Sequence, residues 1–347
     1  MIGWHWAFTI LIWRDTGPYA TSPLGFTTGL WIATWLLQVL PLFFYVGGYV
    51  HLLSWQRARA SGTSIERFVG RRLRAIAVPG LALLVTWTLL GVIVGNVFDA
   101  QWIGKAVELV VSPLWFLAVY LLLIALLPLA LWLHEKFDAL VLVWLAGVAM
   151  CVDIGRFRFG IEGLGWINMV AVWGLAHQLG FFYQRIVVAV RRLDWMLTLI
   201  GFFALFGLVA SGLYPGSMVG VPGERSNMAP PTLCIVALLL FQAGVAELIR
   251  PWVTERLAHR GRWRHATEVM TRFAMPLFLF HTTGMALSRA VQYALRGHVN
   301  EATRPDVWWW LGRPISVVGP LLCTLPVIYL FGRRWTRRAP RHPAATP

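Results

Sequence analysis

A histidine stands inside the first apolar segment of the chain, where His5 lies between Trp4 and Trp6. Ionisable side chains are costly inside a bilayer and therefore often mark a functional site. An imidazole can take a proton from a hydroxyl near neutral pH, as the general base of an acyl transfer must. His5 is therefore a candidate catalytic residue. The alternative is a histidine that a neighbouring helix satisfies, or one at the membrane interface.

Basic residues crowd into IERFVGRRLRAIAVPG, residues 65–80, directly before a long apolar run. Arg71 and Arg74 are three positions apart, so they share a face if the next helix begins there. Two guanidinium groups on one face can hold a pyrophosphate or a 3′-phosphate. The alternative is that these arginines only mark the cytoplasmic side of a membrane protein.

Three further motifs carry candidate residues. His281 lies at membrane depth in MPLFLFHTTGMAL, with a hydrogen-bonded interior histidine as the alternative. Gly47 and Gly48 lie in VLPLFFYVGGYVHLLSW, where small residues also serve tight helix packing. His51 is expected at the cytoplasmic interface, and His177 is a weaker candidate near the inner end of its helix.

Several classes of site are not indicated. Cys151, Cys234 and Cys323 lie far apart in apolar runs, so we expect small buried residues rather than a zinc site or disulfides. No metal site is expected. The sequence has no glycine-rich phosphate loop of Walker or Rossmann type, no GxSxG, no HExxH and no EF-hand pattern.

The composition is that of an integral membrane protein. Of its 347 residues, 58% are hydrophobic and only 13% are charged, where a soluble domain has about 25% charged residues. Long apolar runs of the kind that spans a bilayer begin near Trp31, Ala75, Leu114, Ala139, Gly165, Leu193, Thr232, Phe273 and Arg313. The runs are continuous rather than alternating, which favours helices over a sheet.

The fold class we predict is all-α, a polytopic bundle of about ten transmembrane helices. The first, MIGWHWAFTILIW, is only 13 residues long and resembles the second half of a helix whose first half is missing. Residues 1–332 are expected to form one membrane domain. Residues 333–347 are basic and Pro-rich, which predicts a disordered cytoplasmic tail.

The distribution of charge predicts the orientation. Lys and Arg gather in alternate loops and in the tail, while the opposite loops have few basic residues or mix them with acids. This places both termini in the cytoplasm of a multi-pass protein of the plasma membrane. The net charge of +15 sits in short loops, which argues against nucleic acid as a partner.

The motifs occur in a specific order: GWHWAF, PLFFYVGGY, GRRLRAIAVP, SPLWFLAVYLL and MPLFLFH. In this order the sequence resembles the membrane-bound acyltransferase family 3 over nearly its whole length. Members of that family are bacterial proteins that mostly O-acylate glycans, lipids and natural products. The Trp- and Arg-rich composition resembles the actinobacterial branch.

The resemblance implies roles for particular residues. His5 matches the catalytic histidine of the first helix. Arg71 and Arg74, with Arg72 as a neighbour, match an R-x-x-R motif that binds the acyl-CoA donor. Gly48 matches the glycine of an FFxxSG pattern, with Gly47 where serine is usual. His281 matches a recurrent histidine of a late helix.

The resemblance also implies an activity. We expect a membrane O-acyltransferase that moves an acyl group, acetyl by expectation, from cytoplasmic acyl-CoA to a hydroxyl of an envelope glycan, lipid or natural product. No permanently bound cofactor is expected, and the family's esterase-like domain and the LDGLR-like words that usually precede the first helix are absent from this sequence. Two alternatives stay open: an exporter of a lipid-linked or acylated product, and a structural membrane partner without chemistry.

Overall fold

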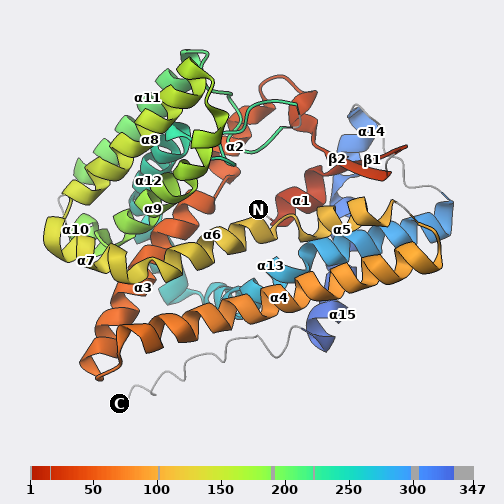
Figure 1. The fold of residues 1–347 in the computed structure, drawn as a ribbon, viewed down its shortest axis with the longest axis horizontal. Coiled ribbons are helices and arrows are strands. Elements are labelled where there is room, and N and C mark those ends of the chain that lie inside the picture. The colour runs from red at the N-terminus through yellow and green to blue at the C-terminus, as the bar shows by residue number, and fades with distance from the viewer. Residues whose placement is uncertain are drawn as a thin grey trace. The chain divides into compact units, whose positions relative to one another are not determined.

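The computed structural model describes residues 2–15, 17–100, 102–188, 192–221, 223–297 and 305–331. Helices dominate these residues (Figure 1). The bounds of the α-helices are α1 Ile2–Phe8, α2 Ala33–Leu37, α3 Leu40–Ala60, α4 Ile65–Val97, α5 Ile103–Val111, α6 Leu114–Ala125, α7 Leu127–Phe137, α8 Leu140–Phe159, α9 Gly165–Gly180, α10 Tyr183–Val188, α11 Arg192–Ala210, α12 Leu233–His259, α13 Gly261–Arg296, α14 Val307–Leu311 and α15 Arg313–Leu330. Short 3-10 helices lie at Pro23–Gly25, Leu30–Ile32 and Glu162–Leu164, and two strands are β1 Ile10–Arg14 and β2 Gly17–Thr21.

Six helical segments of the described chain are long and apolar enough to cross a membrane. They are Leu30–Ala60, Ile65–Val97, Leu140–Phe159, Leu193–Ala210, Leu233–His259 and Arg313–Leu330. The bent pair α5 and α6 would make a seventh span if it counts as one. The multi-pass helical class is therefore confirmed, whereas the number of about ten spans stays a prediction.

The chain divides into two compact units, which are described separately. The first unit comprises Ser22–Val78 and Trp115–Arg250. The second comprises Ile2–Thr21, Pro79–Leu114 and the chain from Pro251 onward. The helices α4 and α12 each contribute residues to both units.

Close helix contacts through glycine organise the first unit, where α9 packs against both α3 and α8. A Cβ atom on Gly48 of α3 would overlap the His177 carbonyl of α9. Likewise, from the side of α9, a Cβ atom on Gly180 would overlap the Tyr45 carbonyl of α3. Helices inside a membrane associate through such small residues because lipid leaves no hydrophobic driving force between them.

The second unit is built on the pair α13 and α15, with α1 packed against both. A Cβ atom on Gly284 of α13 would overlap the Thr324 hydroxyl of α15. Gly319 of α15 similarly faces Ser288 of α13. This close approach fixes the part of α13 that carries His281, three residues before Gly284.

Two predictions were wrong, one about the first segment and one about the burial of the cysteines. The first segment is helical only to Phe8 and then forms an antiparallel hairpin, in which Ile10 pairs with Thr21 and Arg14 with Gly17. The β-branched and aromatic residues after Phe8 favour a strand, and Gly17 supplies the positive φ of 113° that the turn requires. Helix α4 begins at Ile65 and so includes the basic segment as well as the apolar run that starts near Ala75. Of the cysteines, Cys234 is buried as expected, but Cys151 is exposed and Cys323 is partly exposed.

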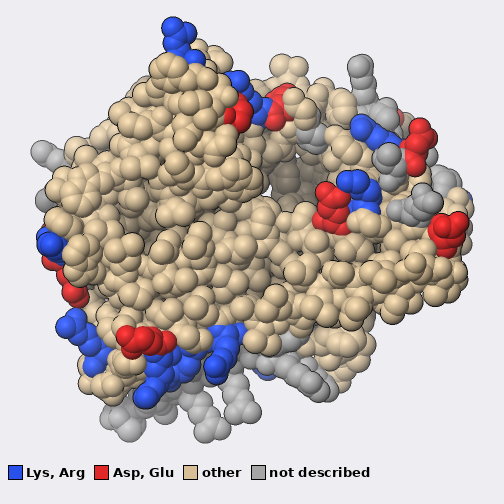
Figure 2. Space-filling model, viewed as in Figure 1, with Lys and Arg blue, Asp and Glu red and all other residues tan. Residues whose placement is uncertain are grey.

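The surface separates charged from apolar regions. Most of the face shown in Figure 2 is uncharged, and Lys and Arg gather over the end where α3 leads into α4. Exposed arginines on these two helices are Arg57, Arg59, Arg67, Arg71 and Arg74. Large apolar side chains such as Leu81 and Leu89 lie exposed farther along α4. The predicted tail, residues 333–347, lies outside the described residues.

Candidate active site

Two histidines that are far apart in the sequence form a hydrogen-bonded pair in the second unit. His5 Nδ1 on α1 lies 3.0 Å from His281 Nε2 on α13. His281 is fully buried, whereas His5 is partly exposed. The sequence marked both residues as candidates but did not predict that they touch.

The partner of the second nitrogen of His281 fixes where the protons lie. His281 Nδ1 is 2.6 Å from the Phe278 carbonyl, which can only accept, so Nδ1 is the donor. In a neutral ring, Nε2 of His281 is then an acceptor, and His5 Nδ1 donates to it. His5 therefore keeps its lone pair on Nε2, and no hydrogen bond from the described residues occupies that nitrogen. The pair presents an unprotonated imidazole nitrogen, as a general base requires.

Neighbouring contacts hold the short helix α1 in place. The indole Nε1 of Trp6 donates to the His281 carbonyl at 3.0 Å, so α1 is tied to α13 beside the pair. Arg313 of α15 donates to the Ala7 carbonyl at 3.4 Å and lies 3.7 Å from the Trp309 ring centroid. A helix of seven residues is not stable alone, so these contacts determine where His5 lies.

The predicted donor arginines lie near the start of α4, in the first unit. Arg71 and Arg74 are exposed and, three residues apart within the helix, lie on one face. Arg72 is partly buried, and its guanidinium lies 4.4 Å from the Phe68 ring centroid. The predicted shared face is thus present, and Arg72 has a packing role that the sequence did not indicate.

Gly47 and Gly48 have different surroundings. Gly48 is a contact point of two helix backbones, which supports the packing interpretation. A Cβ atom at Gly47 would meet the ring of Tyr120 at 3.2 Å and its hydroxyl at 3.4 Å. A serine at position 47 would therefore lie against Tyr120.

A second histidine pair was missed by the sequence analysis. In the first unit, His51 Nδ1 of α3 lies 2.9 Å from His177 Nε2 of α9, and the Tyr120 hydroxyl of α6 lies 3.3 Å from His51 Nε2. His51 is only 2% exposed, and its predicted position at the cytoplasmic interface stays a prediction. The signal in the sequence was two histidines in apolar helices, but nothing there showed that they pair.

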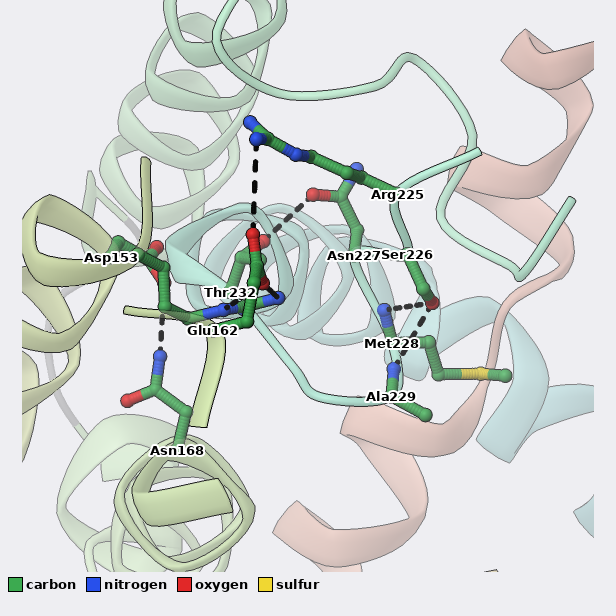
Figure 3. A network of polar contacts seen from close by, with 10 residues as sticks. Asp153, Glu162, Asn168, Arg225, Ser226, Asn227, Met228, Ala229 and Thr232 are labelled. Carbon is green, nitrogen blue, oxygen red and sulfur yellow. Dashed lines mark hydrogen bonds and ion pairs between the residues drawn. The ribbon is translucent and has the colours of Figure 1, made fainter. Parts of the chain in front are cut away.

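A polar network in the first unit is built around the buried Asp153 of α8 (Figure 3). Asp153 accepts hydrogen bonds from Asn168 Nδ2 at 3.0 Å, from the Tyr214 hydroxyl at 3.1 Å and from the Leu233 N–H at 2.8 Å. Burial and the neighbouring Asp153 raise the pKa of the Tyr214 hydroxyl far above its usual range, so Tyr214 remains a donor. The buried Arg156 pairs with Glu162 at 3.3 Å. This network fastens the connection between α11 and α12.

No group of three or more His, Cys, Asp and Glu side chains in the described ranges could hold a metal ion. The arrangement of the second unit is instead that of a paired imidazole that can accept a proton.

Fold and site together define a multi-pass helical membrane protein with a paired histidine. The chain matches the family model of an acyltransferase domain over residues 1–333. It belongs to the membrane acyltransferase family 3, which the order of its motifs indicated. Comparison with curated proteins gave no match, and comparison with solved structures gave none either.

Proposed function

We propose that this membrane acyltransferase is an O-acyltransferase of the plasma membrane, with both termini in the cytoplasm. Its donor is acyl-CoA, with acetyl-CoA as the expected species, and its acceptor is a hydroxyl of an envelope glycan, lipid or natural product. The observation that carries the proposal is the His5–His281 pair, whose hydrogen bonds leave His5 Nε2 as an unprotonated base.

In the proposed step, the acceptor oxygen attacks the thioester carbonyl while its proton passes to His5 Nε2. A carbon–oxygen bond forms, the carbon–sulfur bond breaks, and the departing thiolate takes the proton from His5 to give free CoA. His281 Nε2 accepts the hydrogen bond of His5 Nδ1 throughout, so it orients the ring and stabilises the transient imidazolium. His281 is therefore a positioning residue for the base.

The arginines of α4 supply the donor site in this proposal. Arg71 and Arg74 are exposed on one helix face, and guanidinium groups form paired hydrogen bonds to phosphates. Arg72 contributes as their neighbour. Replacing Arg71 and Arg74 by alanine is expected to raise the KM for acetyl-CoA more than it lowers kcat. Arg67→Ala, in the same basic segment, is the matched control.

The test is transfer of a radiolabelled acetyl group from CoA in host membranes that carry wild type or His5→Ala. Loss of label with His5→Ala, in a protein that still inserts, supports the proposal. Equal labelling with wild type and with His5→Ala would show that His5 is not the general base. Movement of an unmodified substrate without release of CoA would instead show an exporter.

A further inference from the structure

The second unit contains a large apolar cavity of about 840 Å³. Elements that surround it include the β1–β2 hairpin, α4, α5 and α13. Its volume lies within the range of about 300–1,000 Å³ that is usual for small-molecule sites. Neither histidine lines it, but Thr282, the residue after His281, does, and so does Thr9, whose N–H bonds the His5 carbonyl at 3.2 Å. The cavity is therefore lined by residues of the segments that carry the histidine pair, although not by the histidines themselves.

Polar groups in the wall of the cavity form hydrogen bonds within the protein. The Thr282 hydroxyl donates to the Val110 carbonyl at 2.8 Å, and the Trp87 indole donates to the Thr283 hydroxyl at 2.9 Å. These polar groups are satisfied by the protein itself and do not need a partner in the cavity. Among the described residues that line it, Arg289 is the one charged side chain, and it donates to Gln292 at 3.0 Å. Most of the lining side chains are apolar, so the wall suits a hydrocarbon group better than a sugar.

We propose that this cavity holds the hydrocarbon part of an amphipathic acceptor of the lipid class, whose hydroxyl is thereby presented to His5. This inference rests on the proposed function. An acetyl donor has no hydrocarbon chain to place in a cavity of this size. In the orientation that the charges predict, the segment that contains α5 faces away from the cytoplasm, and it lines the cavity. An occupant on that side is the acceptor, because CoA arrives from the cytoplasm.

The direct test uses a photoactivatable dodecanol and the full chain in native membranes. Wild type is compared with Ala286→Phe and with Ala106→Phe, which fill the cavity from α13 and from α5. Ala82→Phe is the matched control, since Ala82 is exposed on α4 and does not line the cavity. Labelling of the cavity peptides 103–110 and 282–290 is divided by the labelling of the lipid-exposed peptide 199–206. This ratio corrects for differences in the amount of probe that enters the bilayer.

In wild type and Ala82→Phe, we expect cavity labelling that excess unlabelled dodecanol abolishes and decanoyl-CoA does not. In Ala286→Phe and in Ala106→Phe, the labelling of the cavity peptides falls by about tenfold or more. Equal labelling in all four proteins overturns the inference. The competition experiment uses wild type alone, so it does not depend on whether a variant folds. Displacement by decanoyl-CoA also overturns it, because the cavity would then belong to the acyl chain of the donor.

The acetyl label distinguishes this inference from the function on which it rests. Label in the solvent-extractable lipid fraction, reduced by Ala286→Phe but not by Ala82→Phe, supports both. Label confined to delipidated glycan overturns the acceptor class while the transferase stands. Saturable labelling of the cavity without any CoA-dependent transfer overturns the proposed function instead.

Discussion

Two histidine pairs, one in each unit, have almost the same separation but different partners. His5 and His281 are 3.0 Å apart, and His51 and His177 are 2.9 Å apart. Both nitrogens of His51 are engaged, one by His177 and the other by Tyr120. In the second unit, a backbone carbonyl engages the far nitrogen of His281, which leaves Nε2 of His5 as a base.

The difference lies in what occupies the remaining nitrogens. A buried imidazole whose nitrogens are both hydrogen-bonded contributes to packing and specificity, and it has no lone pair for a substrate. A partly exposed imidazole that is oriented by one neighbour can take a proton. We therefore propose that the pair of the second unit is catalytic and that the pair of the first is structural.

The largest effect is expected from replacing the base. His5→Gln keeps hydrogen-bonding capacity but cannot take up a proton, so acetyl transfer should fall by about 10²- to 10⁴-fold. His51→Gln is the matched change in the other pair and should leave the rate per inserted molecule near that of wild type. Equal losses in both variants would remove the distinction between the pairs.

The next largest effect is expected at the positioning residue. His281→Phe removes the acceptor of the His5 hydrogen bond, and loss of such an orienting partner typically lowers activity by roughly 10- to 100-fold. We expect kcat to fall, the KM for acetyl-CoA to stay unchanged and the pH profile of kcat to shift. If His281→Phe lowers only the amount of folded protein and leaves the pH profile of kcat unchanged, the role of His281 is purely structural.

Gly48→Ala tests the close contact between α3 and α9, the two helices that carry the His51–His177 pair. The new Cβ atom would overlap the His177 carbonyl, so the helices must separate, at a cost of about 1–3 kcal/mol. The apparent Tm of detergent-extracted protein should fall. Gly47→Ala, whose Cβ atom meets only the side chain of Tyr120 and no backbone, is the control and should have the smaller effect.

His51→Ala should destabilise the first unit with little effect on catalysis. Truncation removes the hydrogen bond between His51 and the buried His177, which costs about 1–3 kcal/mol. The double variant with His177→Ala should lose less than the sum of the two single losses. Strict additivity in denaturation of the purified protein would show that the two rings do not interact.

The smallest effect is expected for Tyr120→Phe, which removes the hydroxyl 3.3 Å from His51. A single hydrogen bond contributes about 0.5–1.5 kcal/mol, so a modest fall in Tm is expected. An increase in acetyl transfer would contradict the structural role of this pair, because it would mean that Tyr120 had been blocking a functional nitrogen of His51.

The sequence was sufficient for the family and for the multi-pass helical class, and it named His5 and His281 as candidates for the site. Continuous apolar runs predict helices because period and length are local properties. The pairing of His5 with His281 depends on contacts across 276 positions, which no local pattern encodes. The same holds for His51 and His177. The hairpin after Phe8 was missed because its apolar residues continue the run without a break.

The proposed base is the lone pair of His5 Nε2. The direct measurement is solid-state NMR of the ¹⁵N-histidine-labelled protein in membranes at neutral pH, with His5 assigned by difference from His5→Gln. We predict a neutral ring that is protonated at Nδ1 and unprotonated at Nε2. A proton on Nε2, in either a neutral or a charged ring, would contradict the assignment of His5 as the base.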